Sequence, residues 1–147
     1  SGLIIVDLQP EEDNDLINEL DKNKINLIRL ITPTTNEERL KLILNNANGF
    51  LYYVSVMGTT GQKSANINEL SESISLVRKY TDLPIVPGFG IKDAETAAAI
   101  GKISDAVIVG SALVSLVEES IENPAVIHKN VGKLLKSMRN ALDLNNC

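Results

Sequence analysis

The stretch IVPGFGI (residues 85–91) decides how the rest of the chain is interpreted. A short apolar run ends in two glycines that flank an aromatic residue, and a helix is expected to start just after them. Glycines at such a junction let the backbone approach a ligand closely or adopt a positive φ. Free backbone N–H groups and a helix start then form a natural seat for an anion, typically phosphate. A second junction, VIVGSA (residues 107–112), repeats the order of strand, glycine and helix.

Working outward from these junctions, the chain alternates apolar runs with amphipathic stretches. The apolar runs are typical of strands buried on both faces, and we expect them at 3–6, 26–31, 50–54, 84–87 and 106–109. Each connection is long enough to hold a helix, which implies parallel strands. The sequence therefore predicts an α/β protein made of five consecutive βα units.

Helix starts are marked by residues that cap helices. Asp93 is a plausible N-cap, and Thr35 or Asn36 could cap an earlier helix, with Glu38 at capping-box distance from Thr35. The acidic run 11–15 is interpreted as a solvated helix start. The connection 55–66 is long and rich in small residues, and connections of this kind are usually either functional lids or disordered.

Composition narrows the function classes. The 147 residues suit one domain, and the net charge of -5 with no Trp gives no support to a nucleic-acid surface. No apolar run reaches the ~20 residues that a membrane span needs. The one cysteine, Cys147, is terminal, which fits a cytoplasmic setting. His128 has no metal-ligand set around it, so we expect no metal site.

Two architectures fit five βα units. One is an open sheet of the flavodoxin or response-regulator kind, which the length favours. The other is part of an eight-stranded (β/α) barrel, which the motifs favour. A response regulator would carry an Asp after the third strand, where this chain has Val54 and Ser55. Barrels often bind phosphate after strands seven and eight, which would make this chain strands four to eight.

Five segments in register resemble the successive signatures of the tryptophan synthase alpha subunit. They are LIIVDL (3–8), ITPTTNEERL (31–40), YYVSVMGTTG (52–61), PGFGI (87–91) and VGSALV (109–114). The resemblance covers residues 1–147 and implies the C-terminal part of a single (β/α)8 TIM-barrel domain. It implies aldol cleavage of indole-3-glycerol phosphate to indole and glyceraldehyde 3-phosphate, a step of tryptophan biosynthesis. It also implies a heterotetramer with a beta subunit, which alone holds pyridoxal phosphate.

The resemblance assigns roles to residues that match the family's motifs. A phosphate seat is formed by Gly61, Gly90, Gly110 and Ser111. An indole pocket is lined by Tyr52, Phe89, Ile4 and Ile108. Thr60 lies in the closing loop, where Met57 departs from the small polar residue expected, and Asp7 is an acid near the pocket and the beta-subunit interface.

On the pattern alone, some of these assignments have ordinary explanations. Ile4 and Ile108 are better explained as packing of buried strands, whereas two strand–glycine–helix junctions in succession favour phosphate. Asp7 is explained equally well as a helix cap or a solvated loop acid.

The family's acid–base chemistry is missing from this chain. The catalytic glutamate and aspartate of the family lie on the second strand and the loop after it, and the chain has neither. No residue here is therefore assigned a catalytic role, and the chain alone is expected to be inactive although the intact protein is a lyase. Two alternatives remain: a non-catalytic truncated half-barrel that binds phosphate, or a fragment of another phosphate-binding barrel enzyme.

Overall fold

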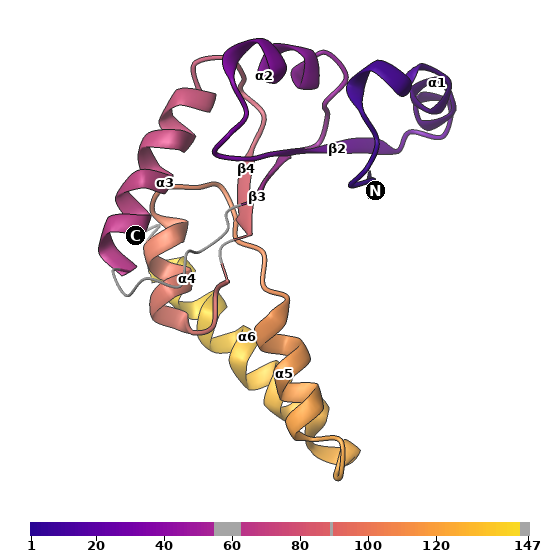
Figure 1. Ribbon diagram of the computed structural model, residues 1–147. Helices are drawn as coiled ribbons and strands as arrows, with labels where there is room; N and C mark the ends of the chain where they lie inside the picture. The colour runs from indigo at the N-terminus through magenta and orange to yellow at the C-terminus, as the bar shows by residue number, and fades with distance from the viewer. Residues whose placement is uncertain (55–62, 89, 145–147) are drawn as a thin grey trace.

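The computed structural model describes residues 1–54, 63–88 and 90–144 (Figure 1). Within these ranges one parallel sheet has the strand order β1-β2-β3-β4. Its strands are β1 (Gly2–Ile4), β2 (Asn26–Ile31), β3 (Leu51–Val54) and β4 (Ile85–Gly88). A flavodoxin-like sheet would place the first strand between the second and the third. The sequential order is therefore that of a barrel wall.

Helices connect the strands and follow the last of them. They are α1 (Asn14–Lys22), α2 (Glu37–Leu44), α3 (Lys63–Val77), α4 (Ala94–Gly101), α5 (Ser111–Glu119) and α6 (Ile127–Asp143), with 3-10 turns at Pro10–Glu12 and Pro124–Val126. Asp93 caps α4 as predicted, accepting from the Thr96 N–H at 2.7 Å. The cap of α2 is Asn36, because the Thr35 hydroxyl instead accepts from the Thr32 N–H. No helix in the described ranges is both long and apolar enough to cross a membrane.

The fifth strand predicted at 106–109 does not form. Residues 105–108 do run beside β4, since the Asp105 N–H donates to the Ile85 carbonyl at 3.2 Å and the Ile108 N–H to the Pro87 carbonyl at 3.3 Å. Those bonds are three residues apart on the segment but two apart on β4. The extra residue breaks the ladder, as in a β-bulge. The Asp105 carboxylate also accepts from the Ile85 N–H, where a regular strand would offer a carbonyl.

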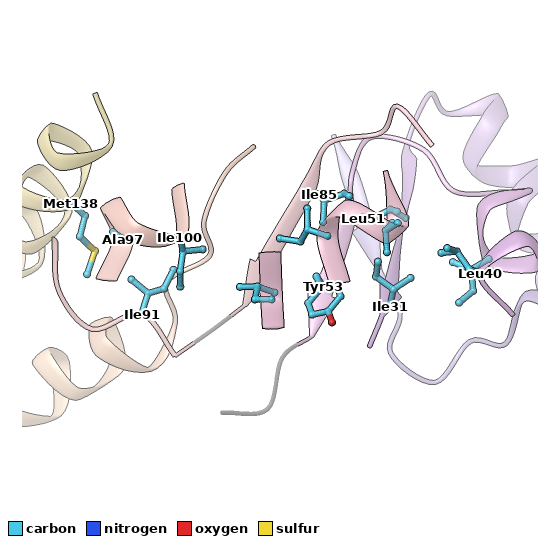
Figure 2. Close-up of a cluster of buried hydrophobic side chains, with 13 residues drawn as sticks. Ile31, Leu40, Leu51, Tyr53, Ile85, Ile91, Ala97, Ile100 and Met138 are labelled. Carbon is cyan, nitrogen blue, oxygen red and sulfur yellow. The ribbon is translucent and has the colours of Figure 1, made fainter. Parts of the chain in front are cut away.

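The sheet buries one face against helices. Strand registers place Ile31 beside Tyr53 and Leu51 beside Ile85, and all four belong to the buried core together with Leu40 and Ile43 of α2 and Leu70 and Ile74 of α3. Figure 2 shows these strand side chains pointing into one cluster with Leu40. Side chains alternate between faces along a strand. The opposite, inner face therefore carries Ile4, Leu30, Tyr52 and Val54.

The core continues beyond the sheet between α4 and α6. Ala97 and Ile100 of α4 meet Met138 of α6 and Ile91, and all four are buried (Figure 2). α5 and α6 lie side by side and extend away from the sheet (Figure 1). Packing against α6 thus fixes the part of the chain that follows β4.

β1 is shorter than predicted and lies at the edge of the sheet. The apolar run continues to Val6, but the strand ends at Ile4, and Val6 is 72% exposed. Among the described strands, β1 pairs with β2 alone. An edge strand with an exposed apolar end is a surface that another strand can cover.

Candidate functional site at the carboxyl edge

All strands of a parallel sheet end at the same edge, and ligands of (β/α) barrels bind there. Here Asp7 follows β1, Thr32 follows β2, and Gly90 follows β4. The segment hydrogen-bonded to β4 brings Gly110 to that edge as well. Four of the predicted site residues therefore lie toward the same edge of the sheet: Asp7, Gly90, Gly110 and Ser111.

The predicted phosphate seat consists of open backbone. Gly90 has a φ of +61°, which favours glycine, and a Cβ there would meet nothing within 4 Å. A Cβ on Gly110 would also meet nothing within 4 Å. Gly110 is the N-cap of α5 and, as a glycine, has no side chain that could cap the helix. Ser111 begins α5 and is exposed. The first N–H groups of a helix have no acceptor inside it, so this edge offers donors to an anion. Gly61 lies outside the described residues.

Tyr52 lies on the inner face, opposite Val86 in the register of β3 and β4. Its ring covers Gly88, because a Cβ added to Gly88 would lie 2.9 Å from both Cε1 and Cζ of Tyr52. A side chain at position 88 would therefore force the Tyr52 ring to shift, which favours glycine there. The Tyr52 ring therefore lies against the end of β4, and its contact with indole stays a prediction.

The other predicted pocket residues are placed less closely together. Ile4 is on the inner face in register with Ile28 and is 42% exposed, and β2 separates its strand from that of Tyr52. Ile108 is half-buried beside β4 through its backbone bond to Pro87. Phe89, Thr60 and Met57 lie outside the described residues.

Asp7 lies three residues past the last residue of β1 and is exposed. Next to it, a cavity of about 340 Å³ opens at the carboxyl ends of β1, β2 and β3. Its walls include Val6, Leu8, Arg29, Thr32, Arg39 and Val54. The shape of this hollow depends on where the connection between β1 and α1 lies.

That connection contains charged contacts that sequence reasoning missed. Asp13, in the acidic run interpreted as solvated, is fully buried and forms an ion pair with Arg29 of β2. Asp13 is buried because the charge of Arg29, within a buried strand, needs a partner. The signal was available, since Arg29 interrupts an otherwise apolar run. Burial, and then the nearby charge of Arg39, lowers the pKa of Arg29 below its usual value.

A second arginine contacts the same connection from the solvent side. Arg39 of α2 donates to the side-chain oxygens of Gln9 and Glu11. A hydrogen bond from the backbone N–H of Glu11, followed by the hydrogen bond from Arg39, lowers the pKa of the Glu11 carboxyl. Acidic residues of the run 11–15 thus make specific contacts with β2 and α2.

In the described part of the chain, the His, Cys, Asp and Glu residues form no group of three that could hold a metal ion. His128 is exposed on α6.

The comparisons with known proteins agree with this arrangement. The family model described as tryptophan synthase alpha chain matches residues 1–143. The tryptophan synthase alpha chain of Thioalkalivibrio sulfidiphilus is 43% identical over 142 residues, which cover 97% of this chain and 53% of the relative. That of Zymomonas mobilis is 45% identical over 141 residues, covering 96% and 52%.

Solved structures give the same answer for the fold. The crystal structure of the tryptophan synthase alpha chain from Legionella pneumophila superposes with a TM-score of 0.83 at 38% identity, covering 97% of this chain and 52% of that one. The four parallel strands are therefore part of a TIM barrel, as predicted. The chain spans about half the length of the relatives it matches. On these matches, the chain belongs to the tryptophan synthase alpha chain family.

Proposed function

We propose that this chain, joined to the rest of the barrel that its relatives possess, cleaves indole-3-glycerol phosphate. The carbon–carbon bond between the indole ring and the glycerol chain breaks, giving indole and glyceraldehyde 3-phosphate. The observation that supports the proposal is that the segment leading to Gly110 and Ser111 is hydrogen-bonded to β4, the strand that Gly90 follows and that pairs with the Tyr52 strand, in a chain of this family. The carboxyl edge offers an anion seat and an aromatic surface next to each other.

The chain's residues bind the two ends of the substrate in this proposal. The backbone N–H groups at Gly90 and Gly110, with the Ser111 hydroxyl and Gly61, hold the phosphate. The indole ring lies against the inner face, lined by Tyr52 and extended by Phe89, Ile4 and Ile108. Thr60 belongs to the loop that closes over the substrate and excludes water. Asp7 lies beside the pocket.

The acid and base of the cleavage come from the part of the barrel outside this chain. A general base must lie within hydrogen-bond reach of the proton it removes. We therefore assign no catalytic residue here and expect no cleavage by the chain alone.

The partner we propose is a tryptophan synthase beta subunit, assembled with the alpha chain as a heterotetramer. The beta subunit receives the indole and holds the pyridoxal phosphate. This chain is proposed to use no cofactor and to work in the cytoplasm.

The test is a chimaera in which this chain is fused to the part of the T. sulfidiphilus alpha chain that it does not match. The purified chimaera is expected to release indole from indole-3-glycerol phosphate, whereas this chain alone releases none. Ser111→Ala should raise the KM of the chimaera more than it changes kcat, since it removes a phosphate contact. A folded chimaera that releases no indole would contradict the proposal.

A further inference from the structure

Asp13 and Arg29 form a buried ion pair to which the proposed function assigns no role. The side chain of Asp13 is 0% exposed and that of Arg29 is 5% exposed. Burying two charges costs desolvation, and replacing such a pair by apolar residues of similar size is often neutral or stabilising. The stability of the fold is thus a weak explanation for this pair, and its geometry is the better guide to its role.

One guanidinium group contacts both ends of residues 8–13, here called segment 8–13. Arg29 Nη1 donates to the Leu8 carbonyl at 3.2 Å, while Nη2 pairs with the Asp13 carboxylate. Asn46, which follows α2, donates from Nδ2 to Asp13 Oδ1 at 3.3 Å. Arg29 itself is fixed in β2, where it pairs in register with Leu51 of β3. Segment 8–13 is therefore attached to the rigid centre of the sheet.

Asp13 also does not make the capping hydrogen bond that is expected of an aspartate at the start of a helix. It is the N-cap of α1, yet its side chain makes no capping bond to the helix. An aspartate at an N-cap commonly accepts from the first N–H groups of the helix. Here the carboxylate forms the ion pair with Arg29 and accepts a hydrogen bond from Asn46, so its contacts are long-range rather than local to the helix start.

Arg39 contacts the middle of segment 8–13. It donates to Gln9 and Glu11 from α2, on the side where its own side chain is 33% exposed. Two arginines from neighbouring elements thus contact four of the six residues of the segment: Leu8, Gln9, Glu11 and Asp13.

We propose that Arg29 and Asp13 are positioning residues that hold segment 8–13 and thereby set the place of Asp7 at the substrate pocket. Asp7 directly precedes Leu8, whose carbonyl the guanidinium holds. The same segment forms a wall of the cavity of about 340 Å³ at the carboxyl edge. The inference rests on the proposed function, in which Asp7 lies beside the substrate.

The experiment replaces the pair by apolar residues of similar size, Asp13→Leu with Arg29→Met, in the chimaera. The unfolding temperature should stay the same or rise. Amide exchange of the peptide covering 7–13 should become at least about tenfold faster, because the segment can open locally. The kcat/KM for indole-3-glycerol phosphate should fall by about tenfold to a hundredfold, since a small misplacement at a site is costly.

The matched control is the double variant Glu19→Leu with Lys22→Met. These residues form an ion pair on α1 whose side chains are 63% and 67% exposed. Removing it should change neither the exchange of 7–13 nor kcat/KM. Arg39→Met should cause the same faster exchange and lower kcat/KM as removing the buried pair, but to a smaller extent. Because it leaves the buried charges in place, it serves as the test if the Asp13→Leu, Arg29→Met variant does not fold.

The Asp7→Asn background distinguishes a positioning role of Arg29 and Asp13 from a merely structural one. If Arg29 and Asp13 act through Asp7, the loss of kcat/KM caused by removing the pair should shrink markedly in the Asp7→Asn background. Equal losses in both backgrounds would overturn the positioning role. Unchanged amide exchange of residues 7–13 would show that Arg29 and Asp13 do not hold segment 8–13. The exchange measurement does not depend on activity. It therefore tests whether Arg29 and Asp13 hold segment 8–13 even if the parent chimaera releases no indole and the proposed function fails.

Discussion

The connection after β1 and the connection after β4 end at the same edge of the sheet, but different groups shape them. Segment 8–13 is contacted by the side chains of Arg29 and Arg39 and includes a fully buried carboxylate. At the other end, a Cβ on Gly90 or Gly110 would meet nothing within 4 Å. Charged side chains fix a loop in one place, whereas open backbone lets a ligand approach. The first end is therefore suited to positioning and the second to binding.

The largest expected effect tests the charged end. Asp13→Asn leaves the Arg29 cation buried without its counter-charge, and it should lower the free energy of unfolding by about 3–5 kcal/mol. Ser111→Ala, at the open end, should change it by no more than about 0.5 kcal/mol, since Ser111 is exposed. Urea unfolding of the chimaera measures both. Similar losses at the two ends would show that the contrast between them is wrong.

The next effect concerns the point where the open end touches the inner face. Gly88→Ala places a Cβ 2.9 Å from ring carbons of Tyr52, and overpacking of this kind should cost about 1–3 kcal/mol. Removing the ring should relieve the clash, so the cost of Gly88→Ala should be smaller in a Tyr52→Ala background. A double-mutant cycle by urea unfolding measures the difference. Equal costs in both backgrounds would mean that the ring does not set the need for glycine.

A smaller effect is expected at Gly90, where space is open but the backbone is restrictive. Its φ of +61° disfavours a side chain, so Gly90→Ala should cost about 1–2 kcal/mol. Asparagine tolerates this conformation better, and Gly90→Asn should therefore cost less than Gly90→Ala. Thermal unfolding of the two variants is the measurement. If the two variants are equally stable, the positive φ is not what requires glycine here.

Much of the fold could be predicted because buried parallel strands leave a clear pattern. The runs at 26–31 and 50–54 each contain a strand of the sheet, the run at 84–87 overlaps β4 in all but one residue, and Asp93 caps its helix. The run at 106–109 has the same composition but forms no strand, because the spacing of its hydrogen bonds to β4 includes an extra residue. Composition reports burial, whereas a ladder also depends on register, which a single sequence does not show.

The candidate site was predictable to a different degree at its two ends. Gly90, Gly110 and Ser111 stand out because glycines directly follow apolar runs, and the structure leaves their surroundings open. The contact of Asp13 with Arg29 joins residues that are sixteen positions apart, and nothing local distinguishes Asp13 from its acidic neighbours. Only the burial of Arg29 in β2 shows that one of them had to be its partner.

The smallest effect tests the exposed contact of segment 8–13 through its pH dependence. The folded state lowers the pKa of Glu11 from its ordinary value of 4.5. A depressed carboxyl pKa adds stability above that ordinary value, and the contribution is lost as the pH falls through the lower folded value. Below about pH 4.5, the urea midpoint of the chimaera should therefore fall more steeply in the parent than in Glu11→Gln. Glu12→Gln is the matched control, because Glu12 is an exposed neighbour that accepts from neither arginine in the part of the chain that the structure describes. It should leave the steep fall unchanged. If Glu11→Gln and Glu12→Gln give the same pH profile, the Arg39 contact does not hold the exposed side of the segment, and Arg29 alone would distinguish this end of the edge from the glycine-rich one.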